Sequence, residues 1–197
     1  MMRVAITGGI ACGKSLFSRY LCQLGVDVLD ADDVVHRLEA PKGEAVSAVI
    51  SVFGEGVRGV DGGIDRAALG ALIFNSAADR ERLNRVVHPL VKSVFNAWLA
   101  EPGPKLKAAV IPLLFEVGWD AEWDVIICVV ASAPVQMDRL VRGRGLSEEQ
   151  ARQRIAAQMP VAEKAARSHL VIHNDADAEA LAQEAVKVYR FLIERSE

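Results

Sequence analysis

The sequence of 197 residues lacks the marks of several classes of protein. Its three cysteines are scattered, with no C-x-x-C pair and no zinc pattern, which favours free thiols in a reducing compartment. No apolar run reaches the roughly 18 residues that a transmembrane helix needs, and the first residues lead into a predicted strand. We therefore expect no membrane span, no signal peptide and a cytoplasmic location. With a net charge of −3, the chain lacks the bulk positive charge that would hold a nucleic acid.

What the chain does have is a large apolar fraction. Hydrophobic residues make up 51% of it, and its length suits one α/β domain or a core with a small insertion. Five short apolar segments predict buried strands, and helical patterns separate most of them, which is typical of a parallel sheet covered on both faces. The predicted strands are Val4–Thr7, Val26–Asp30, Ala108–Ile111, Val125–Val130 and Leu170–His173.

The long gap between the second and third strands contains only helical patterns, which we interpret as a helical insertion over residues 36–103. Pro89 lacks an N–H and disfavours helix at His88, so we expect one helix to end there and another to begin. A loop with five glycines, residues 54–63, separates the first two helical segments. The predicted segments are Glu44–Phe53, Arg66–Phe74 and Ala78–Leu99.

A second helical arm, residues 133–167, follows the fourth strand. A helix over Gln136–Arg144 is expected to end at Gly145, and a capping box over residues 147–150 begins the next helix. The remaining segments, 1–35, 104–132 and 168–197, form the predicted core. In the last of these, the helix Ala178–Arg195 has one apolar face that predicts packing rather than chemistry. That face consists of Leu181, Ala185, Val188 and Leu192.

Residues 8–15, Gly-Gly-Ile-Ala-Cys-Gly-Lys-Ser, form a complete G-x-x-x-x-G-K-[ST] phosphate loop between a strand and a helix. The glycines let the backbone curl so that N–H groups point at phosphate oxygens, and the helix N-terminus adds its positive dipole end. Lys14 is expected to reach the β- and γ-phosphates, and Ser15 to ligate Mg²⁺. A glycine-rich turn that binds nothing is the alternative, and the Lys-Ser pair favours a nucleoside triphosphate site. The predicted ATP contacts here are Gly9, Ala11, Cys12, Gly13, Lys14, Ser15 and Leu16.

A phosphate loop alone does not separate a switch protein from a transferase. GTPases carry a D-x-x-G and an N-K-x-D for their switch and guanine contacts, and this sequence contains neither. A small-molecule kinase instead needs a carboxylate for the acceptor hydroxyl, an acceptor site, and mobile cations that cover the γ-phosphate. The chain has candidates for all three.

Carboxylates follow the second predicted strand, at the sheet edge where open α/β folds bind ligands. If the extended geometry continues, Asp30 and Asp32 project to the same side. One would then accept the proton of an attacking hydroxyl while the other organises the metal shell or a lid. The alternative is a helix cap and turn, where aspartate is also favoured. We favour Asp32 as the catalytic and metal-binding carboxylate.

Arginines supply the candidate cations. Arg139 and Arg142 are spaced to share one helix face, and Arg144 follows them. A solvated basic face is the usual meaning of such a cluster. Here Gly143 and Gly145 could hinge the arm as a lid, which would place Arg139 or Arg142 over the γ-phosphate to stabilise charge in the transition state.

Together these residues resemble the dephospho-CoA kinase family. Residues 5–15 are similar to its T-G-G-I-G-S-G-K-S loop, and residues 30–32 to its D-A-D segment. The ordered set of further matches covers about residues 3–193 and is more specific than the loop. It comprises 64–69 (D-R-x-x-L), 83–89 (L-N-x-x-x-H-P), 112–116 (P-L-L-F-E), 136–142 (similar to Q-x-x-R-L-x-x-R, with Arg142 one position early) and 154–158 (R-x-x-x-Q).

The resemblance implies a nucleotide-kinase-like α/β core, a helical CoA-binding insertion and a lid. It also implies transfer of the γ-phosphate of ATP to the ribose 3′-hydroxyl of dephospho-CoA, with Asp32 as base. From the residues alone, His88 could instead cap a helix, Arg66 could pair with Asp65 or a neighbour, and Glu116 could satisfy buried backbone. The acceptor contacts that the resemblance implies are Thr7, Asp32, Arg66, His88 and Glu116.

Some residues depart from the family pattern. Ala11 and Cys12 replace the usual Gly and Ser, and Leu16 replaces a usual Thr. Ala11 could adopt a backbone angle that alanine accepts only at some cost. Cys12 at a helix N-terminus could have a lowered pKa and react with oxidants, or be a small residue with its side chain outward. Asn174 is expected to contact adenine through its main chain, although Ala176 stands where the family has glycine.

We therefore predict a dephospho-CoA kinase that uses ATP and Mg²⁺, has no nucleic-acid or membrane partner, and is a monomer or weak homo-oligomer. The predicted catalytic residues are Asp32, Lys14, Arg139 and Arg142. Two alternatives stay open, a related kinase of nucleosides or nucleotides and a non-catalytic nucleotide-binding switch. A panel of substrates separates the related kinase from the prediction, and a turnover assay separates the switch.

Overall fold

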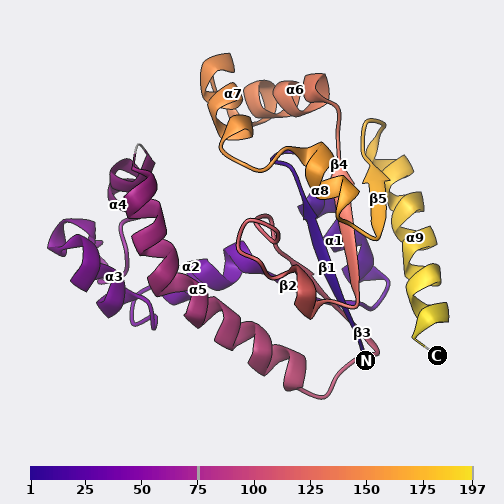
Figure 1. Ribbon diagram of the computed structural model, residues 1–197, viewed down its shortest axis with the longest axis horizontal. Coiled ribbons are helices and arrows are strands. Elements are labelled where there is room, and N and C mark those ends of the chain that lie inside the picture. The colour runs from indigo at the N-terminus through magenta and orange to yellow at the C-terminus, as the bar shows by residue number, and fades with distance from the viewer. Residues whose placement is uncertain (75, 197) are drawn as a thin grey trace. The chain divides into compact units, whose positions relative to one another are not determined.

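The computed structural model describes residues 1–74 and 76–196 (Figure 1). The chain divides into two compact units. The first combines residues Met1–Asp30 with Pro102–Glu197, and the second is Ala31–Glu101. No helix in the described residues is long and apolar enough to cross a membrane.

A parallel sheet forms the centre of the first unit (Figure 1). Within the described residues it has five strands in the order β2-β3-β1-β4-β5, and every pair of neighbours is parallel. The predicted α/β fold with a five-stranded parallel sheet is therefore confirmed. The strands are β1 (Met2–Gly8), β2 (Asp27–Asp30), β3 (Leu106–Val110), β4 (Val125–Val130) and β5 (Leu170–His173).

Helices cover the sheet because its central strands, β1 and β4, carry mostly apolar side chains that are buried. Val4 and Ile6 of β1, with Ile127 of β4, belong to a buried cluster that includes the apolar faces of α1 and α9. The predicted core face of the C-terminal helix is thus confirmed. A shorter helix, α8, contacts β1 and β4. The helices of this unit are α1 (Lys14–Gln23), η2 (Asp120–Glu122), α6 (Ala133–Arg144), α7 (Glu148–Ala156), α8 (Val161–Ala166) and α9 (Ala178–Arg195).

The arm between β4 and β5 follows the predicted local signals. Gly145 ends α6 in the left-handed conformation, with φ of 67°, whereas Gly143 lies inside that helix. The Ser147 hydroxyl accepts a hydrogen bond from the Gln150 N–H at 3.2 Å, and the Gln150 side-chain oxygen accepts one from the Ser147 N–H at 3.0 Å. This capping box satisfies N–H groups that a helix N-terminus leaves without intrahelical partners.

The second unit consists of helices around the long α5, which contacts α2, α3 and α4. The loop that joins α3 and α4 is the predicted glycine-rich one, with an isolated bridge between Arg58 and Ile64. The helices are α2 (Ala31–Glu39), α3 (Val46–Phe53), η1 (Glu55–Val57), α4 (Arg66–Phe74) and α5 (Ala77–Ala100).

The expected break at His88-Pro89 is wrong, because α5 runs through Pro89 without ending. Val87, Val91 and Phe95 are spaced by four residues and are all buried, so an unbroken helix places them on one face. A proline inside a helix costs about 3 kcal/mol. Burial of three large apolar side chains, at about 1.5–3 kcal/mol each, exceeds that cost. His88 is therefore a mid-helix residue and not a cap.

The expected extended geometry from Asp30 to Asp32 is also wrong. The strand β2 ends at Asp30, and α2 begins at the next residue, so Asp32 lies in the first turn of a helix. Val34 and Leu38, four residues apart, are buried on one face of α2. A carboxylate in the first turn is stabilised by the positive end of the helix dipole, which favours this conformation.

Candidate active site

The phosphate loop joins β1 to α1 and is shaped by two residues with positive φ at its ends. Gly8 has φ of 140° and Gly13 has φ of 98°, both in the region that favours glycine. The Lys14 ammonium donates to the carbonyl oxygens of Gly8 and Gly9, at 3.0 and 2.9 Å. The lysine side chain is therefore folded over its own loop, at the N-terminus of α1, where an anion is favoured.

A cavity of about 230 Å³ opens above this loop. It brings together five of the predicted ATP contacts with two arginines of α6. Its lining residues are Ala11, Gly13, Lys14, Ser15, Leu16, Arg139 and Arg144. Lys14, Arg139 and Arg144 make it a basic cavity with the hydroxyl of Ser15 at its wall, which suits a polyphosphate and a hydrated divalent cation.

The two predicted lid arginines differ in their surroundings. Arg139 donates to the carbonyl oxygens of Ala11 and Asn174, at 3.2 and 3.0 Å. Arg142 pairs with Asp138 at 3.0 Å, and its side chain is 85% exposed. The role of Arg142 over a phosphate stays a prediction, whereas Arg144, which was not among the predicted catalytic residues, lines the cavity. The place of Arg144 in the sequence was a signal for this location, because Gly145 ends α6 directly after it and turns the chain.

Side chains from three different segments bind three consecutive residues of the loop. The Gln158 side chain accepts from the Ile10 N–H at 2.9 Å. Arg139 binds the Ala11 carbonyl, and the Asn174 amide donates to the Cys12 carbonyl at 2.8 Å. The predicted contact of Asn174 with adenine stays a prediction; the structure places its side chain against the loop.

The two unusual residues of the loop, Ala11 and Cys12, are a strained residue and a buried thiol. Ala11 has φ of 57°, which is the left-handed conformation that the sequence suggested and that costs a residue with a Cβ. Both expectations for Cys12 are wrong, because its side chain is fully buried and burial raises the pKa of its thiol. Desolvation of the thiolate outweighs the favourable charge of Lys14 and the backbone hydrogen bonds that would lower that pKa.

Glu116 belongs to a network at the end of β3. The ammonium of the fully buried Lys164 lies 2.7 Å from the Glu116 carboxylate and 2.7 Å from the Pro112 carbonyl oxygen. Glu116 also accepts from the Met159 N–H at 3.1 Å. The hydroxyl of Thr7, another fully buried residue, donates to the same Pro112 oxygen at 3.3 Å. Substrate contacts of Thr7 and Glu116 stay predictions.

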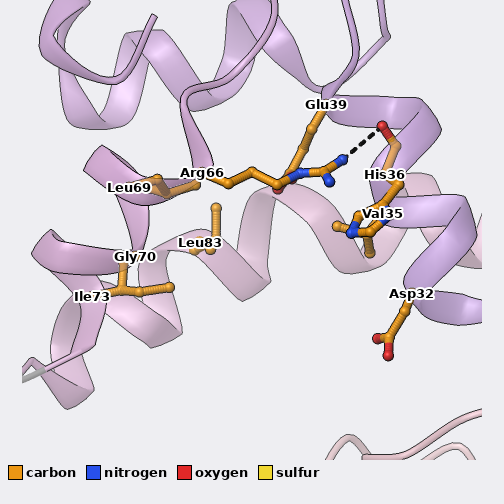
Figure 2. Close-up of a pocket in the computed structure, with 9 residues that line it drawn as sticks. All are labelled: Asp32, Val35, His36, Glu39, Arg66, Leu69, Gly70, Ile73 and Leu83. Atoms are coloured by element: carbon orange, nitrogen blue, oxygen red, sulfur yellow. Dashed lines mark hydrogen bonds and ion pairs between the residues drawn. The ribbon is translucent and has the colours of Figure 1, made fainter. Parts of the chain in front are cut away.

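The second unit has a cavity of about 340 Å³ between α2, α4 and α5 (Figure 2). Asp32 lies at one end of it. Arg66 crosses from α4 to α2, pairs with the nearly buried Glu39 at 3.1 Å, and donates to the His36 carbonyl at 3.0 Å. The pairing of Arg66 with a neighbour, one of the two expectations for it, is thus observed. The remaining wall is apolar and consists of Val35, Leu69, Ile73 and Leu83, with Gly70 and the His36 side chain.

His88, the other predicted acceptor residue of this unit, is half-buried in α5 and does not line this cavity. Burial lowers the pKa of its imidazole, because the charged form loses solvation. In the described residues no group of three or more His, Cys, Asp or Glu could hold a metal ion. A Mg²⁺ ion that arrives with a nucleotide needs fewer ligands, because it keeps several waters and binds phosphate oxygens.

Comparison with known proteins identifies the family. Residues 2–180 match the family model described as dephospho-CoA kinase. The chain belongs to the dephospho-CoA kinase family. It is 37% identical over 192 residues to a dephospho-CoA kinase of Geobacillus kaustophilus, with 96% of each chain covered. It is 41% identical over 188 residues to that of Anaeromyxobacter dehalogenans, with 94% of this chain and 89% of the relative covered.

Solved structures have the same fold as this dephospho-CoA kinase family member. TT1252 from Thermus thermophilus is 32% identical, with a TM-score of 0.84 and 97% of both chains covered. Dephospho-CoA kinase from Campylobacter jejuni, at 24% identity, has a TM-score of 0.73 over 99% of this chain and 98% of that one. Shikimate kinase from Acinetobacter baumannii, at 15% identity, has a TM-score of 0.56, with 99% of this chain and 94% of that one covered. The last two show a shared kinase fold only.

Proposed function

We propose that this chain transfers the γ-phosphate of ATP to the ribose 3′-hydroxyl of dephospho-CoA, which yields coenzyme A in the last step of its synthesis. The observation that carries the proposal is the basic cavity in which Lys14, Ser15 and Arg139 meet, in a chain of this family. We place the reaction in the cytoplasm and expect a monomer or weak homo-oligomer.

The loop cavity would bind the triphosphate. Lys14 would leave the carbonyls of Gly8 and Gly9 and bind the β- and γ-phosphates, exchanging two neutral acceptors for charged ones. Arg139 and Arg144 would stabilise the charge on the transferred group. Ser15 would hold Mg²⁺, with Asp32 as the second candidate, and the ion would neutralise charge between the phosphates.

The cavity of the second unit would bind the acceptor. Its apolar wall suits the adenine ring, and the carboxylate of Asp32 would accept the proton of the 3′-hydroxyl. Arg66 carries a positive charge on the same wall, where the diphosphate of the acceptor would be attracted. His88, Thr7 and Glu116 stay further candidates for acceptor binding.

A coupled assay of ADP release with ATP and Mg²⁺, run with and without dephospho-CoA, tests the proposal. We expect release that depends on dephospho-CoA and a product heavier by one phosphate in mass analysis. Turnover with nucleosides but not with dephospho-CoA would contradict it in favour of a nucleoside kinase. Binding of ATP with no turnover on any acceptor would indicate a nucleotide-binding switch.

A further inference from the structure

Asn174 lies immediately after β5, and its side chain is directed at the phosphate loop and away from solvent. The residue is only 5% exposed. Its amide nitrogen Nδ2 donates to the Cys12 carbonyl at 2.8 Å, and its backbone carbonyl accepts from Arg139 at 3.0 Å. Its backbone N–H donates to Val130 of β4, so the residue is anchored to the sheet at the same time.

The loop and this amide are in close contact. A Cβ atom at Gly13 would lie 2.1 Å from Asn174 Nδ2, a distance that no pair of such atoms adopts. Gly13 is thus required both for its φ of 98° and for the space that it leaves to the amide. This fit makes the Asn174 amide a part of the loop's own structure.

The hydrogen bond to the Cys12 carbonyl also fixes the direction of an N–H group, that of Gly13, which belongs to the same peptide. A trans peptide points its C=O and its N–H in opposite directions. The amide that holds the Cys12 carbonyl therefore determines where the Gly13 N–H points. Arg139 fixes the preceding peptide in the same way, because it donates to the carbonyl of Ala11. Ala11 is itself strained by its left-handed conformation.

We propose that the side chain of Asn174 positions the phosphate loop: through the Cys12 carbonyl it orients the Gly13 N–H toward the phosphates of the nucleotide, and this side chain does not read the base. The proposal rests on the nucleotide-binding part of the proposed function and on nothing about the acceptor. It gives Asn174 a role in affinity for any polyphosphate chain.

The test compares ligands with and without a base. Binding of ATP, GTP and tripolyphosphate, each with Mg²⁺, is measured by calorimetry for the wild type and for Asn174→Ala. Loss of one hydrogen bond that shapes the site should raise the Kd of all three ligands by about tenfold. Asn96→Ala, at an exposed asparagine of α5, is the matched control and should change none. A loss confined to ATP, with tripolyphosphate unaffected, would show that Asn174 reads adenine and would overturn the proposal.

Two further variants separate positioning from a general loss of folding. Asn174→Asp keeps the shape but replaces the donor with an acceptor, which repels the Cys12 carbonyl, so its binding should fall at least as far. Adding Ala11→Gly to Asn174→Ala should recover at least about threefold, since glycine adopts the left-handed conformation without the Cβ cost. That gain should exceed the gain from Ala11→Gly in the wild type.

Thermal unfolding of each variant, followed by circular dichroism, accompanies the binding data. Tripolyphosphate binding by Asn174→Asp at wild-type strength, or equal gains from Ala11→Gly in both backgrounds, would contradict the proposal. Since tripolyphosphate binding needs no acceptor, an enzyme that binds it as expected but ignores dephospho-CoA would refute only the proposed function.

Discussion

The phosphate loop and the cavity of the second unit obtain their binding groups in different ways. In the loop, side chains from distant segments bind the backbone and fix it, as Gln158, Arg139 and Asn174 do. In the second cavity the side chains themselves form the site, and Arg66 pairs with Glu39 across two helices while 44% exposed. The loop is therefore preorganised by packing, whereas the second cavity depends on charged groups that water also reaches.

The phosphate loop and the cavity of the second unit should therefore differ in their sensitivity to substitution. A preorganised backbone site loses most when the cation held within the loop itself or the shape of the loop is removed, because the backbone N–H groups cannot be substituted. A side-chain site loses binding in separate steps, one group at a time.

Lys14→Ala should have the largest effect, in both binding and rate, because in the proposed function its charge would bind the phosphates in the ground state and in the transition state. We expect kcat/KM for ATP to fall by about 10⁴-fold, in the range of a cation that stabilises a transferred phosphate. Steady-state kinetics measure it, with the exposed Lys187→Ala on α9 as control. A fall of less than tenfold would mean that the loop backbone alone carries the site.

Asp32→Asn should affect the rate and leave the loop untouched. If Asp32 is the general base, kcat should fall by about 10³-fold, while ATP binding measured by calorimetry stays at the wild-type value. Asn keeps the shape of the side chain and loses only the interaction of one carboxylate with the helix dipole, about 0.3–1 kcal/mol, so the protein should still fold. Full activity in this variant would remove Asp32 from the mechanism, and a parallel loss of ATP binding would break the distinction between the two sites.

Of the two substrates, Arg66→Ala should affect the acceptor alone and by a smaller factor; it also removes the ion pair of the nearly buried Glu39, which lowers stability. We expect the KM for dephospho-CoA to rise by about 20-fold, the effect of a hydrogen bond between charged groups, with the KM for ATP unchanged. Arg85→Ala, an exposed arginine of α5 that pairs with Glu81, is the control. Adenosine, which lacks the diphosphate, serves as a truncated acceptor or inhibitor, and Arg66→Ala should leave its binding unaltered. Equal losses for both ligands would refute a contact with the diphosphate.

Substitution of His88 should have the smallest effect, which concerns the stability of the fold at acidic pH. Burial lowers the pKa of His88 from its ordinary value of 6.5, so the unfolded chain binds a proton there more readily than the folded one. Stability is then complete above about pH 6.5 and is lost as the pH falls through 6.5 toward the lowered pKa. His88→Gln should flatten that part of the curve of unfolding temperature against pH. An unchanged slope would show that His88 does not titrate as its burial demands.

Local patterns predicted much of the fold. The ends of β4 and β5 agree with the predicted strands. β4 is buried on both faces and is therefore a continuous apolar run, whereas β5 is partly exposed and was predicted from three consecutive apolar residues. The end of α6 at Gly145 and the capping box of α7 were also confirmed, because the caps of a helix depend only on residues close in the sequence. The ordered motifs also predicted the family, and the comparisons confirm it.

Features set by contacts between distant residues escaped prediction. The helix α2 was missed for a local reason, because its aspartates also suit a turn. A usable signal was present: acidic residues stand in its first turn, and His36 and Arg37 stand in its last turn. The continuity of α5 depends on packing that Pro89 does not reveal. The bond from Asn174 to Cys12 joins positions 162 residues apart, and no local spacing encodes it.

The burial of Cys12 has a practical consequence for chemical probes of this protein. Cys12 and Cys128 are both buried, and the pKa of Cys128 is raised to about 11, so neither thiol offers an accessible thiolate at neutral pH. Cys22, on the last turn of α1, is exposed. Maleimide dyes should therefore attach at Cys22 in the native enzyme, which provides a fluorescence reporter on the helix that begins at Lys14 without any engineered cysteine. Covalent inhibitors aimed at the loop thiol should, by the same reasoning, fail.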